Sequence, residues 1–296
     1  MEEKLINYGG QAVIEGVMMR GRRFYTLAMR APDGAIVTRT EPLGNIYRSR
    51  LARLPFLRGL ILLWDALGLG LRALTLSANL QAGEDEKIEG PALYLTLGLT
   101  FLLAIGIFFL APAGVGWLSE HFLRWNAWWS NLLEGLLRLV FLIAYIWGIG
   151  FMPDVRRVFA YHGAEHKTIN AYEAGADLTP ASVARFPLAH TRCGTAFLLT
   201  LVVLSLLVFT LLGPLPLAWR LVSRVLMIPV LAGLAYEFIR WTANHIDRPW
   251  VRAMVAPNLA LQSLTTRPPD AAMLEVAIRA FQEMRRAEME EQETSG

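Results

Sequence analysis

The sequence is poor in several residue types and motifs, and each shortage excludes a class of protein. It has one cysteine, Cys193, in 296 residues, so no intramolecular disulfide can form and nothing indicates an oxidising compartment. The first eleven residues are acidic and polar, and no cleavable signal peptide is predicted. The sequence lacks a P-loop, a dinucleotide fingerprint, a G-x-S-x-G elbow and interleaved basic and aromatic residues. No nucleotide or nucleic-acid partner is therefore predicted.

Charge is scarce as well, and apolar residues take its place. Only 18% of residues are charged and 54% are hydrophobic, with a mean hydropathy of +0.39. The apolar residues gather in long runs, which is typical of an integral membrane protein. Four runs are each long enough to cross about 30 Å of hydrocarbon: 92–117, 132–152, 194–213 and 221–241. An aromatic belt is predicted at one membrane interface, formed by Trp117, Trp125, Trp128 and Trp129.

A fifth apolar segment, residues 54–80, carries polar residues at intervals of seven. Arg58, Asp65, Arg72 and Asn79 would share one face of a helix. A membrane-spanning helix would place Asp65 near the bilayer centre, at a cost of roughly 2.5–3.5 kcal/mol. We therefore favour an interfacial or re-entrant helix over the alternative of a fifth span whose polar stripe faces the bundle.

The distribution of arginine and lysine predicts the orientation in the membrane. Positive residues are frequent in the N-terminal region, in the 153–193 loop and in the C-terminal region. The 118–131 loop has only Arg124, and the 214–220 hairpin has only Arg220. By the positive-inside rule, both termini and the 153–193 loop are predicted to be cytoplasmic. The formal net charge of +3 is attributed to this arginine excess.

The two ends of the chain are predicted to form the cytoplasmic parts. Residues 24–30 and 35–40 flank a turn at 31–34 and have the pattern of a β-hairpin. The glycine-punctuated stretch 9–21 is interpreted as a further strand with tight turns at its ends. Near the C-terminus, Asp270 is an N-cap candidate. The helix after it has an apolar stripe, expected to dock on the cytoplasmic domain or the membrane face: Met273, Leu274, Ala277, Ile278, Phe281 and Met284.

These patterns predict a mostly α-helical, polytopic membrane helix bundle. It has about four spans and an interfacial or re-entrant helix, with a small N-terminal β-containing cytoplasmic domain and a C-terminal cytoplasmic helix. The predicted units are a β-rich domain at 1–50, the amphipathic helix at 54–80, a first transmembrane hairpin at 92–152, a cytoplasmic loop and helix at 153–193, a second transmembrane hairpin at 194–241, and the C-terminal segment at 244–296.

The 153–193 loop contains the pattern H-x-x-E-H. His162 and His166 share a helical face at i and i+4, a spacing that lets two imidazoles bind one Zn²⁺. Glu165 lies in the order found in inverted zincins, where the glutamate is a general base. Glu173 follows His162 by eleven residues, about three turns, and returns to the same face. A divalent metal site, with zinc as the preferred ion, is therefore predicted here.

Three further residues are candidates to complete this site. His190 and Cys193 precede the third apolar run and offer an imidazole and a thiol for a tetrahedral site. Glu237 lies inside the fourth run, where a carboxylate indicates a functional role or a distant ligand. The alternatives are that the histidines pair with carboxylates and lipid phosphates, that Cys193 is a small buried hydrophobe, and that Glu237 forms a salt bridge with Arg240 or Arg192.

Four segments together resemble a known family. GGQAVIEGVMMRG at 9–21, YHGAEHKT at 161–168 with AYE at 171–173, HTRCGT at 190–195 and LALQSLTT at 259–266 are similar to the bacterial DUF1385 (YqhQ-like) membrane family. The resemblance runs nearly end to end and implies a protein of the bacterial cytoplasmic membrane. Family members have been described as predicted metal-dependent enzymes. Thr191 departs from the proline expected between His190 and Arg192 and affects the loop backbone more than any ligand.

The matching positions, taken together, draw attention to one set of polar residues: His162, Glu165, His166, Glu173, His190, Arg192 and Cys193.

Two functions follow from these observations. The first is a membrane-embedded metal-dependent hydrolase at the cytoplasmic membrane face, with Glu165 as base and Arg192 stabilising an oxyanion. Its substrate would be a lipid or a membrane-proximal peptide. The second is a non-catalytic transporter, channel or assembly scaffold that binds lipid headgroups. In that case Arg58, Asp65, Arg72 and Glu237 would line a path, and small-residue faces at Gly68 and Gly70 would permit a homo-oligomer.

Overall fold

The N-terminal region folds into a four-stranded antiparallel sheet in the order β1-β2-β3-β4. The computed structural model describes residues 8–44, 54, 56–82, 90–191, 193–213 and 215–294. The predicted hairpin is confirmed as β3 (Phe24–Arg30) and β4 (Ile36–Pro42). The stretch 9–21 differs from the prediction, because it forms two strands, β1 (Gly9–Val13) and β2 (Gly16–Arg20). The chain reverses between them at Glu15, which adopts a left-handed conformation with φ of 53°.

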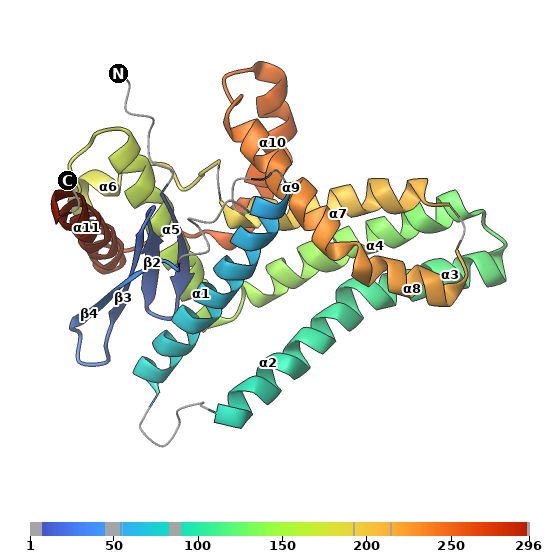
Figure 1. Ribbon diagram of the computed structural model, residues 1–296, viewed down its shortest axis with the longest axis horizontal. Coiled ribbons are helices and arrows are strands. Elements are labelled where there is room, and N and C mark those ends of the chain that lie inside the picture. Colours follow the sequence, from blue (N-terminus) through green and yellow to red (C-terminus); the bar gives the residue numbers. More distant parts are fainter. Residues whose placement is uncertain are drawn as a thin grey trace.

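Helices cover both faces of this sheet (Figure 1). On one face lie α5 (Pro153–Glu173) and α11 (Ala271–Thr294), which share a buried core with Val17, Met19 and Ala28. On the other face lies α1 (Leu57–Gln81), whose Ala73 packs against Met18 and Leu27. The sheet therefore joins the helix carrying the H-x-x-E-H pattern to the amphipathic helix predicted at 54–80.

The C-terminal helix α11 is fastened to the sheet by its apolar stripe and by one carboxylate. Asp270 accepts a hydrogen bond from the Met273 N–H at 2.8 Å, which confirms the predicted N-cap. Glu288 is buried and accepts hydrogen bonds from the backbone N–H groups of Arg22 and Arg23, at 2.5 and 3.0 Å. The predicted stripe is buried throughout: Met273, Leu274, Ala277, Ile278, Phe281 and Met284.

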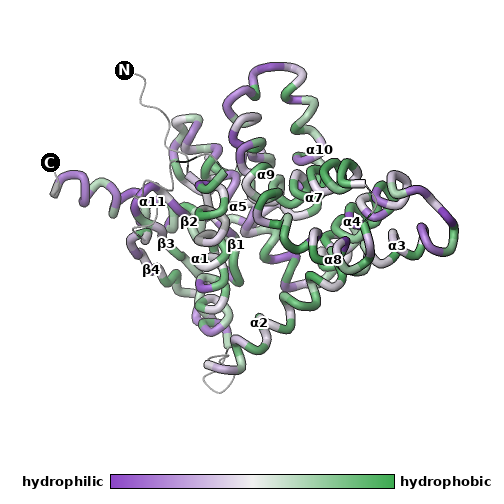
Figure 2. The backbone as a smooth tube through the Cα atoms, turned by 45° about the vertical axis from the view of Figure 1, so that its right-hand side comes forward, coloured by the Kyte–Doolittle hydropathy of each residue, from purple (hydrophilic) through white to green (hydrophobic). Residues whose placement is uncertain are grey.

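The apolar runs form long helices, which Figure 2 shows as predominantly hydrophobic stretches away from the sheet. Three helices are long and apolar enough to cross a membrane, or four if one bent pair counts as a single span. This finding concerns only the described part of the chain. Helix α1 is not among the helices found. The first comprises α2 (Gly90–Ile105), the π-helical η4 (Gly106–Leu110) and α3 (Ala111–Leu123). The others are α4 (Ala127–Ile149), α7 (Gly194–Leu211), and α8 (Leu217–Leu226) with α9 (Ile228–Ala243), bent by 43°.

The predicted 118–131 loop is much shorter in the structure. Only three residues, 124–126, separate α3 from α4. Arg124 takes a left-handed conformation with φ of 54° and ends α3, and Asn126 then caps α4 by accepting the Trp129 N–H at 3.1 Å. The cap lets helix form where the tryptophan-rich sequence had indicated an interfacial loop.

Two further helices complete the fold around α5. The short α6 (Pro180–Val183) follows α5, and the chain then runs back to Cys193 at the N-terminus of α7. Helix α10 (Pro249–Thr265) packs against α7 and α4. As a result, the start of α7 and the end of α10 both lie beside α5.

Candidate metal centre

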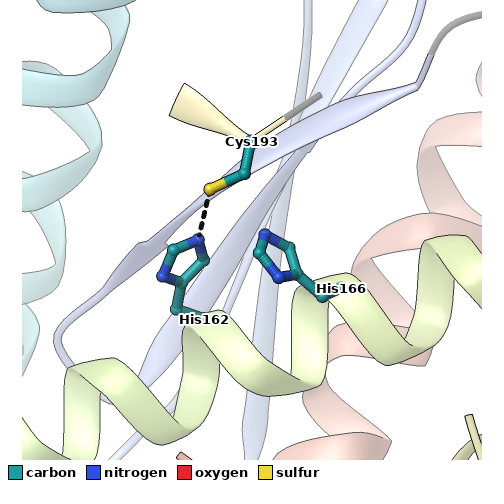
Figure 3. A group of neighbouring side chains, drawn as sticks. All are labelled: His162, His166 and Cys193. Carbon is teal, nitrogen blue, oxygen red and sulfur yellow. Dashed lines mark hydrogen bonds between the residues drawn. The ribbon is translucent and has the colours of Figure 1, made fainter. Parts of the chain in front are cut away.

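Helix α5 presents two imidazoles side by side. Pro153 starts the helix, in the first turn where its missing N–H costs no hydrogen bond. His162 and His166 then follow one turn apart, and their ring centroids lie 4.3 Å from each other. Figure 3 shows both rings on the side of α5 that faces Cys193. The predicted i, i+4 pairing is therefore present in the structure.

Backbone carbonyls fix the orientation of both rings. His162 Nδ1 lies 2.9 Å from the Thr265 carbonyl oxygen at the end of α10. His166 Nδ1 lies 2.6 Å from the Leu188 carbonyl oxygen. Because a carbonyl can only accept, each Nδ1 donates its proton, and in a neutral ring with this tautomer Nε2 carries the lone pair that a metal would need. Histidines that bind metals characteristically have this second hydrogen bond.

Cys193 brings a sulfur atom to the same place. Its Sγ lies 3.2 Å from His162 Nε2, and its side chain caps α7 by accepting the Thr195 N–H. One ligand atom each from His162, His166 and Cys193 lie within 4.8 Å of one another. Among the described residues, His166 Nε2 is a buried nitrogen with no hydrogen-bond partner. Two imidazoles and one thiol fit a zinc site, and the unpartnered nitrogen supports such a use.

Glu165 lies between the histidines in sequence but turns toward the sheet. Its side chain is buried, and its carboxyl group accepts a hydrogen bond from the Gly10 N–H of β1. Burial raises the pKa of Glu165 to about 7, although the nearby His162 and the Gly10 hydrogen bond act in the opposite direction. Its Oε2 is buried and has no hydrogen-bond partner within the described ranges. A carboxyl group with this pKa can exchange a proton near neutral pH.

The other predicted site residues lie in different positions. His190 is buried beside His166, with ring centroids 5.4 Å apart, and its backbone is held by two hydrogen bonds with Gln262. Glu173 is the last residue of α5, about 16 Å along the helix axis from His162, so the structure does not bring it to the histidines. Arg192 lies outside the described residues.

Glu237 has a structural partner. Its carboxylate binds the Arg58 guanidinium, with Nε to Oε1 at 2.7 Å, and accepts the Phe56 N–H at 3.2 Å. The salt bridge is therefore made with Arg58, and Glu237 holds the start of α1 against α9. Among the described residues no salt bridge joins Glu237 to Arg240, and the alternative partner Arg192 lies outside them. Glu237 does not belong to the set of His162, His166 and Cys193, whose ligand atoms lie close together.

A second polar cluster, inside the helix bundle, was not predicted. Glu134 binds Arg138 at 3.0 Å, Arg224 at 2.7 Å and Arg220 at 3.2 Å. We call these four residues the arginine cluster, and each has a side chain no more than 2% exposed. The sequence does carry a signal for it, because both Glu134 and Arg138 in α4 and Arg220 and Arg224 in α8 are charged i, i+4 pairs within apolar segments.

Comparisons with known proteins show what this chain is similar to. Residues 54–287 match the family described as "Protein of unknown function (DUF1385)". The chain is 35% identical over 300 residues to the "Uncharacterized protein YqhQ" of Bacillus subtilis (strain 168), and the match covers 95% of this chain and 93% of the relative. No solved structure matches the chain.

Proposed function

This chain belongs to the DUF1385 family, and we propose that it is a membrane-embedded, metal-dependent hydrolase. One observation carries the proposal: the backbone carbonyls of Thr265 and Leu188 orient the rings of His162 and His166, whose ligand atoms converge with the sulfur of Cys193. A buried arrangement of this kind leaves polar atoms unpaired, which is costly unless they bind something.

The three donors suit zinc, and a three-residue set leaves one coordination position open, as catalytic sites require. Zinc held there by His162, His166 and Cys193 would supply Lewis-acid activation of water for hydrolysis of a carbonyl or phosphoryl centre. The chain's own part is to hold the ligands, with His162 anchored to α10 and His166 anchored to the loop before α7. Such anchoring preserves ligand orientation through turnover.

Glu165 is the proposed proton-transfer group. Burial holds its pKa near the middle of the physiological range, the range in which a carboxyl group can both accept and release a proton. The Gly10 N–H binds one side of this carboxyl group, while Oε2 remains unpartnered among the described residues. Arg192, next to Cys193 in the chain, is the proposed oxyanion-stabilising residue.

The proposed location is the cytoplasmic face of a bacterial cytoplasmic membrane, with both termini on that side. Its support is the arginine distribution of the sequence and the presence of three or four helices able to cross a membrane. A site at the start of α7 and beside the sheet favours a substrate at the membrane surface, either a lipid or a membrane-proximal peptide.

The metal content of the detergent-purified protein tests this proposal. We expect about one equivalent of zinc or another divalent metal per chain, lost in the His162→Ala/His166→Ala double variant. His121→Ala is the matched control, because His121 is exposed and its ring contacts are with Trp117 and Phe122 of its own helix α3. A folded wild-type protein that binds no added zinc would overturn the proposal.

The contact between sulfur and imidazole favours a second candidate, a cysteine-dependent acyl hydrolase. His162 Nε2 lies 3.2 Å from Cys193 Sγ and its Nδ1 is held by Thr265, which is the geometry of a base beside a nucleophile. The thiol proton would pass to His162, the sulfur would attack an acyl carbon, and the alcohol or amine of the substrate would leave with that proton as a thioester forms. Water would then hydrolyse the thioester, which releases the acid and restores the thiol. Zinc protection of Cys193 against iodoacetamide supports the metal site, whereas rapid alkylation of zinc-supplemented protein, slowed by His162→Ala, supports the nucleophile.

The transport or scaffold alternative gains less support. In the predicted polar path, Arg58 forms a salt bridge with Glu237, and Arg72 forms one with Glu41. These charged groups therefore bind one another instead of facing a transported ion or a lipid headgroup. The side chain of Asp65 lies outside the described part. Homo-oligomer formation and lipid binding stay predictions.

A further inference from the structure

The loop between α6 and α7, residues 184–193, carries Cys193 to α5 without regular secondary structure. Within its described part, residues 184–191 and 193, no helix or strand forms. Such a segment cannot pair its own backbone groups as a helix does, so other parts of the chain must supply the partners. Two carboxamide side chains do so here, Asn170 of α5 and Gln262 of α10.

Asn170 holds the part of this loop that contacts His166. Its Nδ2 donates to the carbonyl oxygens of Pro187 and Ala189, both at 3.0 Å. These two carbonyls flank that of Leu188, which accepts from His166 Nδ1. Asn170 therefore fixes the stretch of chain in which the Leu188 carbonyl reaches His166.

Gln262 holds the part of the loop nearest to Cys193. The residue is only 1% exposed, its Oε1 accepts the His190 N–H at 2.8 Å, and its Nε2 donates to the His190 carbonyl oxygen at 2.9 Å. One carboxamide thus binds both backbone groups of a residue, as a paired strand would. His190 lies three residues before Cys193 in the chain, so Gln262 fixes the approach of the chain to that position.

The same turn of α10 also holds His162 and the start of α7. Thr265 follows Gln262 by three residues and shares its helical face. Its carbonyl oxygen accepts from His162 Nδ1, and its hydroxyl oxygen lies 3.2 Å from that of Thr195 in the first turn of α7. The last turn of α10 therefore binds His162 directly and binds the chain on both sides of Cys193.

The end of α10 is itself fastened to α5. Just beyond α10, the Arg267 N–H donates to the Phe159 carbonyl oxygen at 2.9 Å. Gly163 permits this close approach, because a Cβ atom added there would overlap the Arg267 carbonyl oxygen. The spacing between α5 and α10 is thus fixed, and Gln262 extends that fixed geometry to the loop that carries Cys193.

We propose that Gln262 is a positioning residue of the candidate metal centre, which holds the sulfur of Cys193 where it can share one ion with His162 and His166. Gln262 does not belong to the set of His162, His166 and Cys193 (the His-His-Cys set), and it acts through the backbone of His190. The inference rests on the proposed function, because ligands are positioned only if a metal binds them. Removal of a group that orients metal ligands lowers metal affinity by about 10–100-fold.

Zinc and cobalt binding to the full-length, detergent-purified protein tests the proposal. Competition with a chelator gives the zinc affinity, and cobalt(II) bound to a thiolate shows a sulfur-to-metal charge-transfer absorption. Gln262→Met keeps the approximate size of the side chain and removes both hydrogen bonds. We expect it to weaken zinc binding by about 10–100-fold. We also expect a weaker charge-transfer absorption at full cobalt occupancy, because the sulfur is no longer held beside the imidazoles.

Gln81→Met is the matched control, because Gln81 also donates to a backbone carbonyl, that of Arg30 at 2.7 Å, but joins α1 to β3. We expect it to leave the zinc affinity and the absorption unchanged. Cys193→Ser gives the cobalt spectrum without sulfur. Gln262→Glu retains the acceptor for the His190 N–H, so both of its readouts should lie between those of wild type and Gln262→Met, and it decides the question if Gln262→Met does not fold.

The other outcomes contradict the positioning role in distinguishable ways. Wild-type affinity and absorption in the Gln262 variants would overturn it and leave the metal centre in place. Equal losses in Gln262→Met and Gln81→Met would also overturn it, because they would reflect general destabilisation. Cobalt bound to the wild type without the sulfur absorption would show that Cys193 is not a ligand. A folded wild-type protein that binds neither metal would overturn the proposed function, and this inference with it.

Discussion

The protein buries two polar clusters that differ in whether their buried polar atoms have hydrogen-bond partners. In the arginine cluster within the helix bundle, Glu134 contacts three guanidinium groups, and Asn131 accepts from two of them, at 2.7 and 3.0 Å. In the described structure, none of its buried side-chain atoms lacks a hydrogen-bond partner. In the cluster around α5, His166 Nε2 and Glu165 Oε2 are buried without one.

The difference separates a structural role from a functional one. Buried charges are tolerated when each finds partners, and the arginine cluster meets that condition by tying α8 to α4. Buried polar atoms left without partners in a folded protein call for another explanation, and a ligand or a reacting group is the usual one. We therefore propose a stabilising role for the arginine cluster and a chemical role for the α5 cluster, and the following predictions test that proposal.

The largest effect is expected at Glu134. Glu134→Gln removes the negative charge shared by Arg138, Arg220 and Arg224, and breaking such a buried group destabilises a protein by about 3–5 kcal/mol. Unfolding in mixed micelles with increasing SDS measures the loss. Glu120→Gln is the control, because Glu120 is 21% exposed and contacts only Arg220 in this network. Equal stability of Glu134→Gln and wild type would show that the cluster is not structural.

A smaller effect is expected from Gly10→Ala. The new methyl group would lie 2.6 Å from the Met18 carbonyl oxygen and 2.9 Å from Cδ of Glu165, and such overpacking costs about 1–3 kcal/mol. Displacement of β1 also weakens the hydrogen bond that Glu165 receives. The same SDS titration measures the loss, and zinc content is expected to stay near wild type. Gly98→Ala, in open space on α2, is the matched control. A stability equal to wild type would mean that β1 is not held against Glu165.

The ion pair between Glu15 and Arg157 should contribute less and depend on pH. The Arg157 hydrogen bond lowers the pKa of Glu15 below its usual value of 4.5. A lowered carboxyl pKa stabilises the folded state above pH 4.5 and loses that contribution as the pH falls below it. Arg157 is half exposed, so Glu15→Gln should cost only about 0.2–1 kcal/mol at neutral pH. Thermal unfolding at several pH values should show this difference closing in acid. A stability difference between wild type and Glu15→Gln that increases in acid would contradict the predicted lowering of the Glu15 pKa.

The smallest effect on stability is expected at Glu165. Gln is isosteric and can still accept the Gly10 N–H, and it avoids burying a charge, so Glu165→Gln should change stability by less than about 0.5 kcal/mol. Zinc content should be unchanged, because Glu165 is not in the His-His-Cys set. Glu134→Gln, the same chemical change, is the comparison. A loss as large as that of Glu134→Gln would remove the distinction between the two clusters.

The sequence predicted the parts of this structure that depend on local periodicity. The hairpin at 24–40, the C-terminal stripe after Asp270 and the pairing of His162 with His166 all follow from spacing along one element. Cys193 was predicted only as one of several candidates, because its distance from α5 depends on how the loop after α6 folds back. The carbonyls of Thr265 and Leu188 could not be predicted at all, because every residue has a carbonyl.

The arginine cluster was missed for a different reason. Its four members lie on two helices. Glu134, Arg138 and Arg224 fall inside apolar runs predicted as spans, and Arg220 falls in the predicted 214–220 hairpin. Their burial depends on the turn of α8 toward α4, which no periodicity within either helix specifies. Likewise, the two-strand arrangement of 9–21 depends on the left-handed backbone of Glu15, a conformation uncommon for a non-glycine residue.

The fastening of α11 to the sheet has a consequence for how the protein is made. Residues 8–44 leave the ribosome before α11, which packs on them, and before Glu288, which accepts hydrogen bonds from the backbone of Arg22 and Arg23. Between these events α5 alone can cover that face of the sheet, and the cover is incomplete until α11 is made. We expect the candidate metal centre on α5 to become fully ordered only after α11 has been synthesised, so that a nascent chain whose apolar helices are all complete still lacks a finished site.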